Sequence, residues 1–219
     1  MTTTARTTPQ STSTRRSGIP GLVGALGMSA GLLGAVHAVL LLAYPPAVAD
    51  NSYSFPFRPG AFAASQVVLT ARDLALAVLI AGLLWTPVAR GWAGRLGIVG
   101  GAASMLALAG LEIVSVAVGD SVDPGAWYGL ASFGVGLGLS MAGVSAARTP
   151  MRTSWMRLLP LAIGLYVFVI LTPGILAGFA PGQVVIGGWM LLFARLGREL
   201  LTTSPVSNRQ SDRGLGATP

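Results

Sequence analysis

Long apolar stretches, separated by short polar connections, occupy the chain from residue 19 to residue 201. Six of them can be delimited, at roughly 19–44, 61–86, 93–119, 126–147, 157–180 and 182–201. A helix rises about 1.5 Å per residue, so most of these stretches can cross a hydrocarbon core about 30 Å thick. The pattern therefore predicts an all-α, polytopic membrane protein, folded as a six-transmembrane-helix bundle.

The two ends of the chain lack this pattern. Residues 1–18 are rich in Thr and Ser, and residues 202–219 are polar, so both segments are predicted to be disordered tails. The sixth apolar stretch is the weakest, because its uninterrupted apolar run covers only 184–194. To reach full length, it needs the side chains of Arg195 and Arg198 to extend to the membrane surface.

Composition supports a membrane location and excludes several kinds of functional site. Hydrophobic residues make up 53% of the 219 residues and charged residues only 10%, whereas soluble domains carry about 25% charged residues. The absence of cysteine excludes disulfides, thiolate nucleophiles and iron–sulfur clusters. With one histidine, no P-loop and no serine-hydrolase motif, we expect no enzymatic activity, no cofactor and no metal.

The distribution of arginine predicts the orientation. All 14 basic residues are Arg, and twelve of them fall on one side of the predicted bundle; the others are Arg58, in the first opposite connection, and Arg72, inside the second stretch. By the positive-inside rule, both termini are predicted to be cytoplasmic, with the protein in the cell (inner) membrane. This placement accounts for the net charge of +7 without a nucleic-acid partner. The expected partner is the lipid bilayer, and a homo-oligomer or a membrane partner is left open.

A different reading of the first stretch starts from Arg15 and Arg16. Together with Ala47-Val48-Ala49, they could form a twin-arginine signal with a cleavage site. The apolar stretch between them runs about 25 residues, however, while the apolar region of a signal peptide runs about 7–15. A retained first helix is therefore the favoured interpretation.

Small residues recur at four-residue spacing inside three of the predicted helices. Glycines at this spacing let helix backbones approach closely in lipid. The motif is common in membrane helices, so close packing within one chain is favoured over a dimer contact. The motifs are Gly27-x-x-x-Gly31, Gly97-x-x-x-Gly101 and Gly134-x-x-x-Gly138.

A few polar and ionisable residues lie deep inside the apolar stretches. At a helix centre an Arg or Asp costs about 2.5–3.5 kcal/mol, so these groups must find compensating partners. On a helical wheel, each lies on the small-residue or polar side of its helix, and their depths place them together in the outer half of the bundle. The predicted cluster consists of His37, Gln66, Arg72, Asp73 and Glu112.

The pairing within this cluster can be predicted from side-chain directions. Adjacent residues on a helix point about 100° apart, so Arg72 and Asp73 are not expected to be each other's best partner. We expect Arg72 to pair with Glu112, and Asp73 to accept a hydrogen bond from His37 or Gln66.

Two functions remain open for such a protein. In the first, it is a small structural or accessory membrane protein whose buried ion-pair cluster fixes the register of the helices. In the second, the cluster is a site, and the protein is a carrier or binder of a small solute, lipid or proton. Access to the cluster from outside would favour the second function, and a dry, fully paired cluster would favour the first.

Three segments resemble parts of multi-pass membrane proteins common in actinobacteria, a group with no established activity. They are YSFPFRPGAFAASQVV (53–68), LPLAIGLYVFVILTPG (159–174) and IGGWMLLFARLG (186–197). The resemblance implies membrane location and six helices. It implies no site residues.

Overall fold

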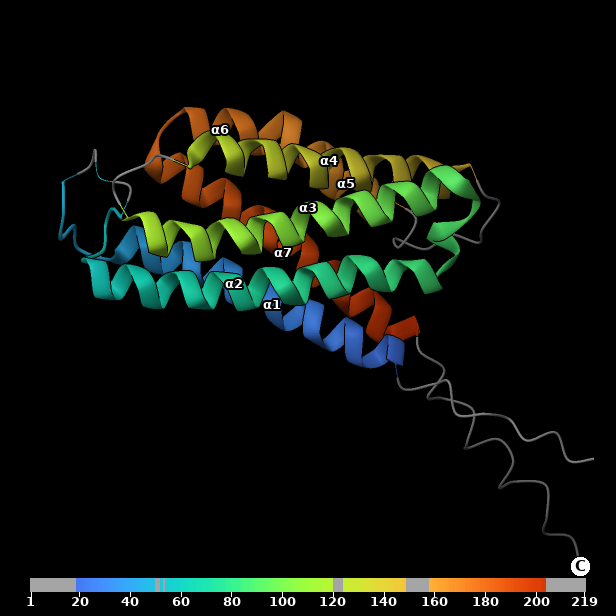
Figure 1. Ribbon diagram of the computed structural model, residues 1–219. Coiled ribbons are helices and arrows are strands. Elements are labelled where there is room, and N and C mark those ends of the chain that lie inside the picture. Colours follow the sequence, from blue (N-terminus) through green and yellow to red (C-terminus); the bar gives the residue numbers. More distant parts are fainter. Residues whose placement is uncertain (1–18, 50–51, 53, 120–123, 149–157, 204–219) are drawn as a thin grey trace, which may run out of the picture.

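The computed structural model describes residues 19–49, 52, 54–119, 124–148 and 158–203, which fold almost entirely as helices (Figure 1). Four long helices come first: α1 (Ile19–Ala43), α2 (Pro59–Gly82), α3 (Gly91–Val118) and α4 (Gly125–Ala147). A composite rod follows, made of α5 (Leu159–Tyr166), the π-helical turn η5 (Val167–Leu171) and α6 (Thr172–Leu176), and then α7 (Phe179–Thr203). Two short 3₁₀ turns, η1 (Leu83–Trp85) and η2 (Pro87–Ala89), join α2 to α3.

The six apolar stretches thus correspond to six helical rods with closely similar boundaries. One difference concerns the C-terminal tail, because Thr202 and Thr203 extend α7 rather than belong to the tail. The remaining parts of the predicted tails, 1–18 and 204–219, lie outside the described residues.

The rods form a closed ring. Each rod packs against the next one in the sequence, and α7 packs along the full length of α1, so the last helix of the described chain closes the ring onto the first (Figure 1). Ile19 and Thr203 therefore lie at the same end of the bundle, which we call the terminus end. The opposite end, where α1 leads into α2, is called the loop end.

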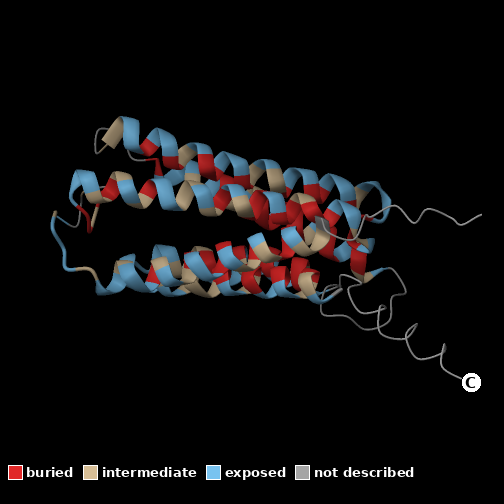
Figure 2. Ribbon diagram, turned by 90° about the horizontal axis from the view of Figure 1, so that it is seen from below, coloured by how far each residue is buried: buried red, intermediate tan, exposed pale blue. Residues whose placement is uncertain are grey.

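The outside of the ring is apolar and its inside holds the polar groups. Large apolar side chains such as Val67 (68% exposed) and Leu130 (62% exposed) cover the outer surface, while Asp73 and Glu112 are buried (Figure 2). A water-soluble protein distributes these residues the other way round. In the described chain, α1 to α4 and the α5–α6 rod are long and apolar enough to span a membrane. The protein is therefore a helical membrane protein.

The last helix, α7, differs from the other rods in its polarity. It carries two arginines and a glutamate in its final turns and is not among the five spans recognised by length and apolarity. Arg195 and Glu199 form an ion pair with an N–O distance of 3.0 Å, one helical turn apart. Its 25 residues nevertheless match α1 in length, and the two helices pack side by side.

Glycines bring the backbones into contact mainly in the terminus half of the bundle. A methyl group on Gly138 of α4 would lie 2.5 Å from the backbone of Gly97 and Gly101 on α3, and one on Gly31 of α1 would lie 2.5 Å from the backbone nitrogen of Ala194 on α7. All three predicted glycine motifs face other helices of the same chain, as expected.

The glycines of the loop half behave differently. Gly110 of α3 and Gly129 of α4 have open space where a side chain would start, and Gly34 of α1 meets side chains of α7 and α2 rather than their backbones. The closest backbone contacts at glycines are therefore those in the middle and the terminus half of the bundle.

This difference predicts opposite effects of adding one methyl group. We expect Gly138→Ala to lower the free energy of unfolding in detergent by about 1–3 kcal/mol, because the α3–α4 backbones must move apart. The matched variant Gly110→Ala adds the same group into open space on α3, and we expect it to be neutral or slightly stabilising. Thermal or denaturant unfolding of the purified protein measures both; equal midpoints for the two variants would contradict the close approach at Gly138.

Candidate functional site

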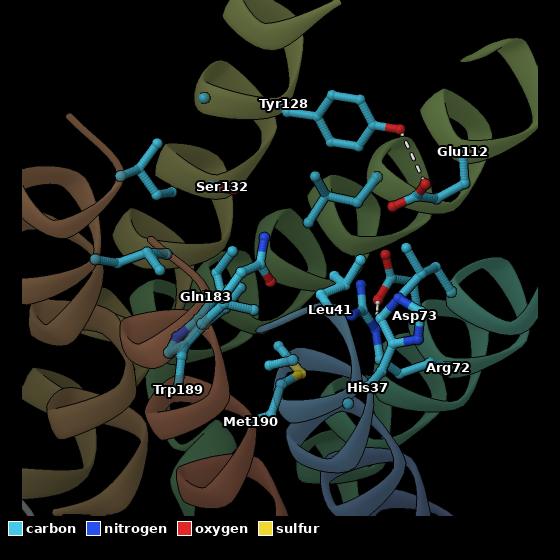
Figure 3. A pocket seen from close by; sticks show the side chains of 18 of the residues that line it. His37, Leu41, Arg72, Asp73, Glu112, Tyr128, Ser132, Gln183, Trp189 and Met190 are labelled. Carbon is cyan, nitrogen blue, oxygen red and sulfur yellow. Dashed lines mark hydrogen bonds and ion pairs between the residues drawn. The ribbon is translucent and has the colours of Figure 1, made fainter. Parts of the chain in front are cut away.

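A cavity of about 550 Å³ occupies the loop half of the ring. Every rod contributes to its wall, and Figure 3 shows the lining side chains converging on one space. The polar and charged residues that line it are His37, Gln66, Arg72, Asp73, Glu112, Tyr128, Ser132, Thr172 and Gln183. The five residues predicted from the sequence are all among them, so the structure brings the whole cluster to one cavity.

In the terminus half, large apolar side chains of the described residues fill the interior of the ring. Leu76 and Ile80 of α2, Leu139 of α4 and Phe193 of α7 are completely buried. Leu76 lies only one turn beyond Asp73 along α2, so this apolar layer begins directly beneath the charged residues. The cavity is therefore closed toward the terminus end.

An ion pair between neighbours lies at the base of the cavity. Arg72 Nε donates to Asp73 Oδ1 over 2.7 Å, and the side chains of Arg72 and Asp73 are only 10% and 1% exposed. The expectation that these two residues would not pair is therefore wrong. Their Cα–Cβ bonds do diverge, but the three methylenes of arginine let its guanidinium bend back to the adjacent carboxylate, a reach that a helical wheel does not represent.

Asp73 has one oxygen left over. Its Oδ2 is buried and, among the described residues, finds no hydrogen-bond donor; the same holds for Oε1 of Gln66, about two turns earlier on α2. The predicted hydrogen bond from His37 or Gln66 to Asp73 is thus absent. Buried acceptors are normally satisfied, and a carboxylate oxygen without a donor costs about 1–3 kcal/mol or more. Both atoms belong to residues that line the cavity.

Glu112 of α3 is held by a tyrosine. Tyr128 of α4 donates its hydroxyl to Glu112 Oε2 over 3.0 Å (Figure 3). Glu112 makes no ion pair with Arg72 within the described chain, so the predicted Arg72–Glu112 pair is wrong as well. From the sequence, Tyr128 was indistinguishable from an aromatic residue at the membrane surface, a place that its neighbour Trp127 does occupy at 62% exposure.

His37 of α1 completes the group. Its Nε2 lies 3.1 Å from the hydroxyl of Ser65 on α2, a contact that ties these two helices together above the ion pair. Because the imidazole contacts a hydroxyl rather than a carboxylate, His37 is not part of the Arg72–Asp73 pair. It remains a wall residue of the cavity.

The wall opposite the charges lies outside the predicted cluster of five residues. It comes from α7 and from the α5–α6 rod, through Gln183, Trp189, Met190 and Thr172. Trp189 Nε1 donates to the carbonyl of Ile163 over 3.3 Å, and the hydroxyl of Thr172 donates to the carbonyl of Val167 over 2.8 Å, across the π-helical turn. The same carbonyl also accepts from the backbone N–H of Thr172, so the hydroxyl adds a second donor to it.

The residues that line the cavity do not resemble a metal centre. Among the described residues, no three His, Cys, Asp or Glu side chains lie close enough together to hold a metal ion. What the arrangement offers is a mostly apolar space with hydrogen-bond acceptors at one end.

Comparisons with known proteins do not identify a family. No protein-family model, curated protein or solved structure matches this chain. The functional argument therefore depends on the geometry of the cavity itself.

The observed pairing predicts different effects for the two carboxylates. We expect Asp73→Asn to destabilise the protein by about 3–5 kcal/mol, because it leaves the Arg72 charge buried and unpaired. Glu112→Gln keeps an oxygen that can accept from Tyr128, and we expect it to cost much less. Accumulation in the membrane and the unfolding midpoint in detergent measure both variants; an equally severe loss for Glu112→Gln would mean that Arg72 depends on both carboxylates.

Proposed function

We propose that the protein binds a small molecule in the cavity of the loop half, as a membrane-embedded receptor or carrier. The observation that supports this most strongly is at Asp73, a lining residue of a cavity of about 550 Å³, whose buried Oδ2 has no donor among the described residues. A donor on a bound molecule would satisfy it. The volume falls within the range of about 300–1,000 Å³ that is typical of small-molecule pockets.

A purely structural role fits this geometry less well. The Arg72–Asp73 pair alone would serve to compensate two buried charges, and a structural cluster would be close-packed and fully hydrogen-bonded. The terminus half shows that this chain can pack closely, with large side chains such as Leu76, Leu139 and Phe193 completely buried. The cavity in the loop half therefore occurs specifically where the polar residues lie.

The same proposal includes the orientation of the molecule. The described arginines at the terminus end are Arg90, Arg95, Arg148, Arg195 and Arg198, whereas Arg58 is at the loop end. The positive-inside rule then supports six crossings, with α7 as the sixth, cytoplasmic termini and a location in the cell (inner) membrane. In this orientation the cavity faces the outside of the cell. The bilayer is the surrounding partner, and nothing in the basic distribution calls for nucleic acid.

Access to the cavity can be tested with a single cysteine, because the natural chain has none. Ser132 lines the cavity on α4, while Leu130, two residues earlier, points outward and is 62% exposed. We expect Ser132→Cys to react with a charged methanethiosulfonate reagent in membrane vesicles, because thiolates form only where water is present. We expect Leu130→Cys to remain unreactive in lipid. An unreactive Ser132→Cys would refute an accessible cavity.

The orientation predicts a second labelling pattern. In intact cells, a membrane-impermeant maleimide should modify Ala49→Cys, in the exposed loop between α1 and α2, but not Thr202→Cys at the end of α7. Permeabilising the cells should make Thr202→Cys reactive. The reverse pattern would place the termini outside, and labelling of both before permeabilisation would mean that α7 does not cross the membrane.

A further inference from the structure

The lining of the cavity indicates the kind of molecule that fits it. Most of the wall is apolar, contributed by side chains such as Leu41, Leu69, Ile186, Trp189 and Met190. The acceptors described above, Asp73 Oδ2 and Gln66 Oε1, belong to two lining residues of α2, about two turns apart on the same helix. A complementary molecule is therefore amphipathic: a mostly apolar body with hydrogen-bond donors at one end.

The charges of the lining favour a cationic donor over an anion. Two carboxyl groups, Asp73 and Glu112, face one guanidinium, that of Arg72, whose Nε is already bonded to Asp73 Oδ1. The remaining ionisable side chains of the wall are His37 and Tyr128, which are held by Ser65 and Glu112 respectively. An ammonium group would supply both the donors that Asp73 Oδ2 requires and a charge opposite to that of the carboxylates. An anionic headgroup would find one guanidinium and two carboxyl groups in the same wall.

The wall of the ring is weakest between α4 and α6. Among the described residues, α4 packs extensively on α5, less on η5 and least on α6, so these rods diverge toward the loop end. Phe133 of α4 and Phe168 of η5 stack at a centroid distance of 5.5 Å and close the seam at its deeper end. Beyond this ring pair, Gly129 offers no side chain, and a methyl group placed there would meet nothing within 4 Å.

The rim of this opening is both apolar and exposed. Leu176 and Ile175 of α6 line the cavity and are also 82% and 48% exposed on the outer surface of the ring. Gly129 and Phe133, one turn apart on α4, line the cavity from the other side and are exposed as well. Residues that belong to both surfaces mark the place where the cavity communicates with the exterior.

The described loop residues between α1 and α2 cover a different part of the ring. Phe57 packs against Tyr44 at the end of α1, with centroids 4.6 Å apart, and Phe55 packs against Phe179 at the start of α7, at 4.9 Å. These contacts place the loop over the α1–α7 side. Neither of these ring contacts reaches the α4–α6 side.

From these observations, and on the basis of the function proposed above, we infer that the ligand is an amphiphile with a protonated amine, which enters sideways from the bilayer through the α4–α6 slot. Its ammonium group binds at Asp73 Oδ2, with Glu112 nearby, and its apolar body fills the space lined by α1 and α7. The slot is defined by Gly129 and Phe133 on α4 and by Ile175 and Leu176 on α6.

The test uses two photoreactive probes of equal length in proteoliposomes containing the full chain. One is dodecylamine carrying a diazirine, and the other is dodecanoic acid carrying the same diazirine. Crosslinked peptides are identified by mass spectrometry at increasing times after mixing. We expect the amine to label cavity residues such as Leu69 and Ile186 at least severalfold more than the acid does. We expect Glu112→Gln to reduce labelling by the amine, because it removes one of the two carboxylates.

The route is tested with a matched pair of glycine variants. Gly129→Leu adds a bulky side chain at the slot, and Gly110→Leu adds the same side chain to the outer face of α3; at both positions a Cβ meets nothing within 4 Å. We expect Gly129→Leu to slow labelling by the amine severalfold, and Gly110→Leu to label at the rate of the natural chain. Equal rates for the two variants would overturn the slot as the route.

The remaining outcomes separate this inference from the function on which it depends. Equal or stronger labelling by the acid would overturn the amine, while the cavity would stand as a binding site. If neither probe labels the cavity although Ser132→Cys reacts with the thiol reagent, the membrane amphiphile is wrong and the accessible site remains. If Ser132→Cys is unreactive too, both proposals fail.

Discussion

The close approach of helix backbones at glycines is the constraint on which this structure depends. Helices in lipid gain little from hydrophobic association, since lipid tails are as apolar as leucine, and packing at small residues takes over that role. Here, Gly24, Gly31, Gly138 and Gly143 all meet backbone atoms of a neighbouring helix, and all lie in the middle or the terminus half of the bundle. The cavity lies toward the opposite end of the ring, and the polar residues of α2 and α3 contribute to its wall.

The charged residues follow from this arrangement. Charged side chains at the depth of Asp73 and Glu112 are costly when they face lipid. They are tolerated when they face a cavity that can hold water or a ligand. Arg72 donates a hydrogen bond to one oxygen of Asp73, and Tyr128 donates one to one oxygen of Glu112. Neither carboxylate is thereby saturated, since each has a second oxygen with further acceptor capacity. Helix packing thus determines where the cavity lies, and the carboxylate oxygens with spare acceptor capacity determine which groups can bind there.

Much of the fold could be predicted from the sequence, because the signals for it are local. Run length delimits the rods, and helical periodicity puts Gly97, Gly101 and Glu112 on one buried stripe of α3. The composition of the cluster could also be predicted, since depth along a helix is proportional to residue number. Its internal bonds could not. The Arg72–Asp73 pair depends on the bending of a long side chain, and the Tyr128–Glu112 bond depends on how far α4 is rotated about its axis. The walls from α7 and α6 depend on ring closure, a contact between the first and last helices that no local pattern encodes.

The pairing of two adjacent residues also has a consequence for how the protein is made. An ion pair drawn from two different helices would leave each charge alone until both helices had left the translocon and met in the bilayer. Arg72 and Asp73 reach the membrane together on α2, and their 2.7 Å contact needs no other part of the chain. The costliest residues of the bundle can thus be inserted as a locally neutral pair, before α3 has been synthesised. The cavity above them takes shape only when α7, the last helix of the ring, packs against α1.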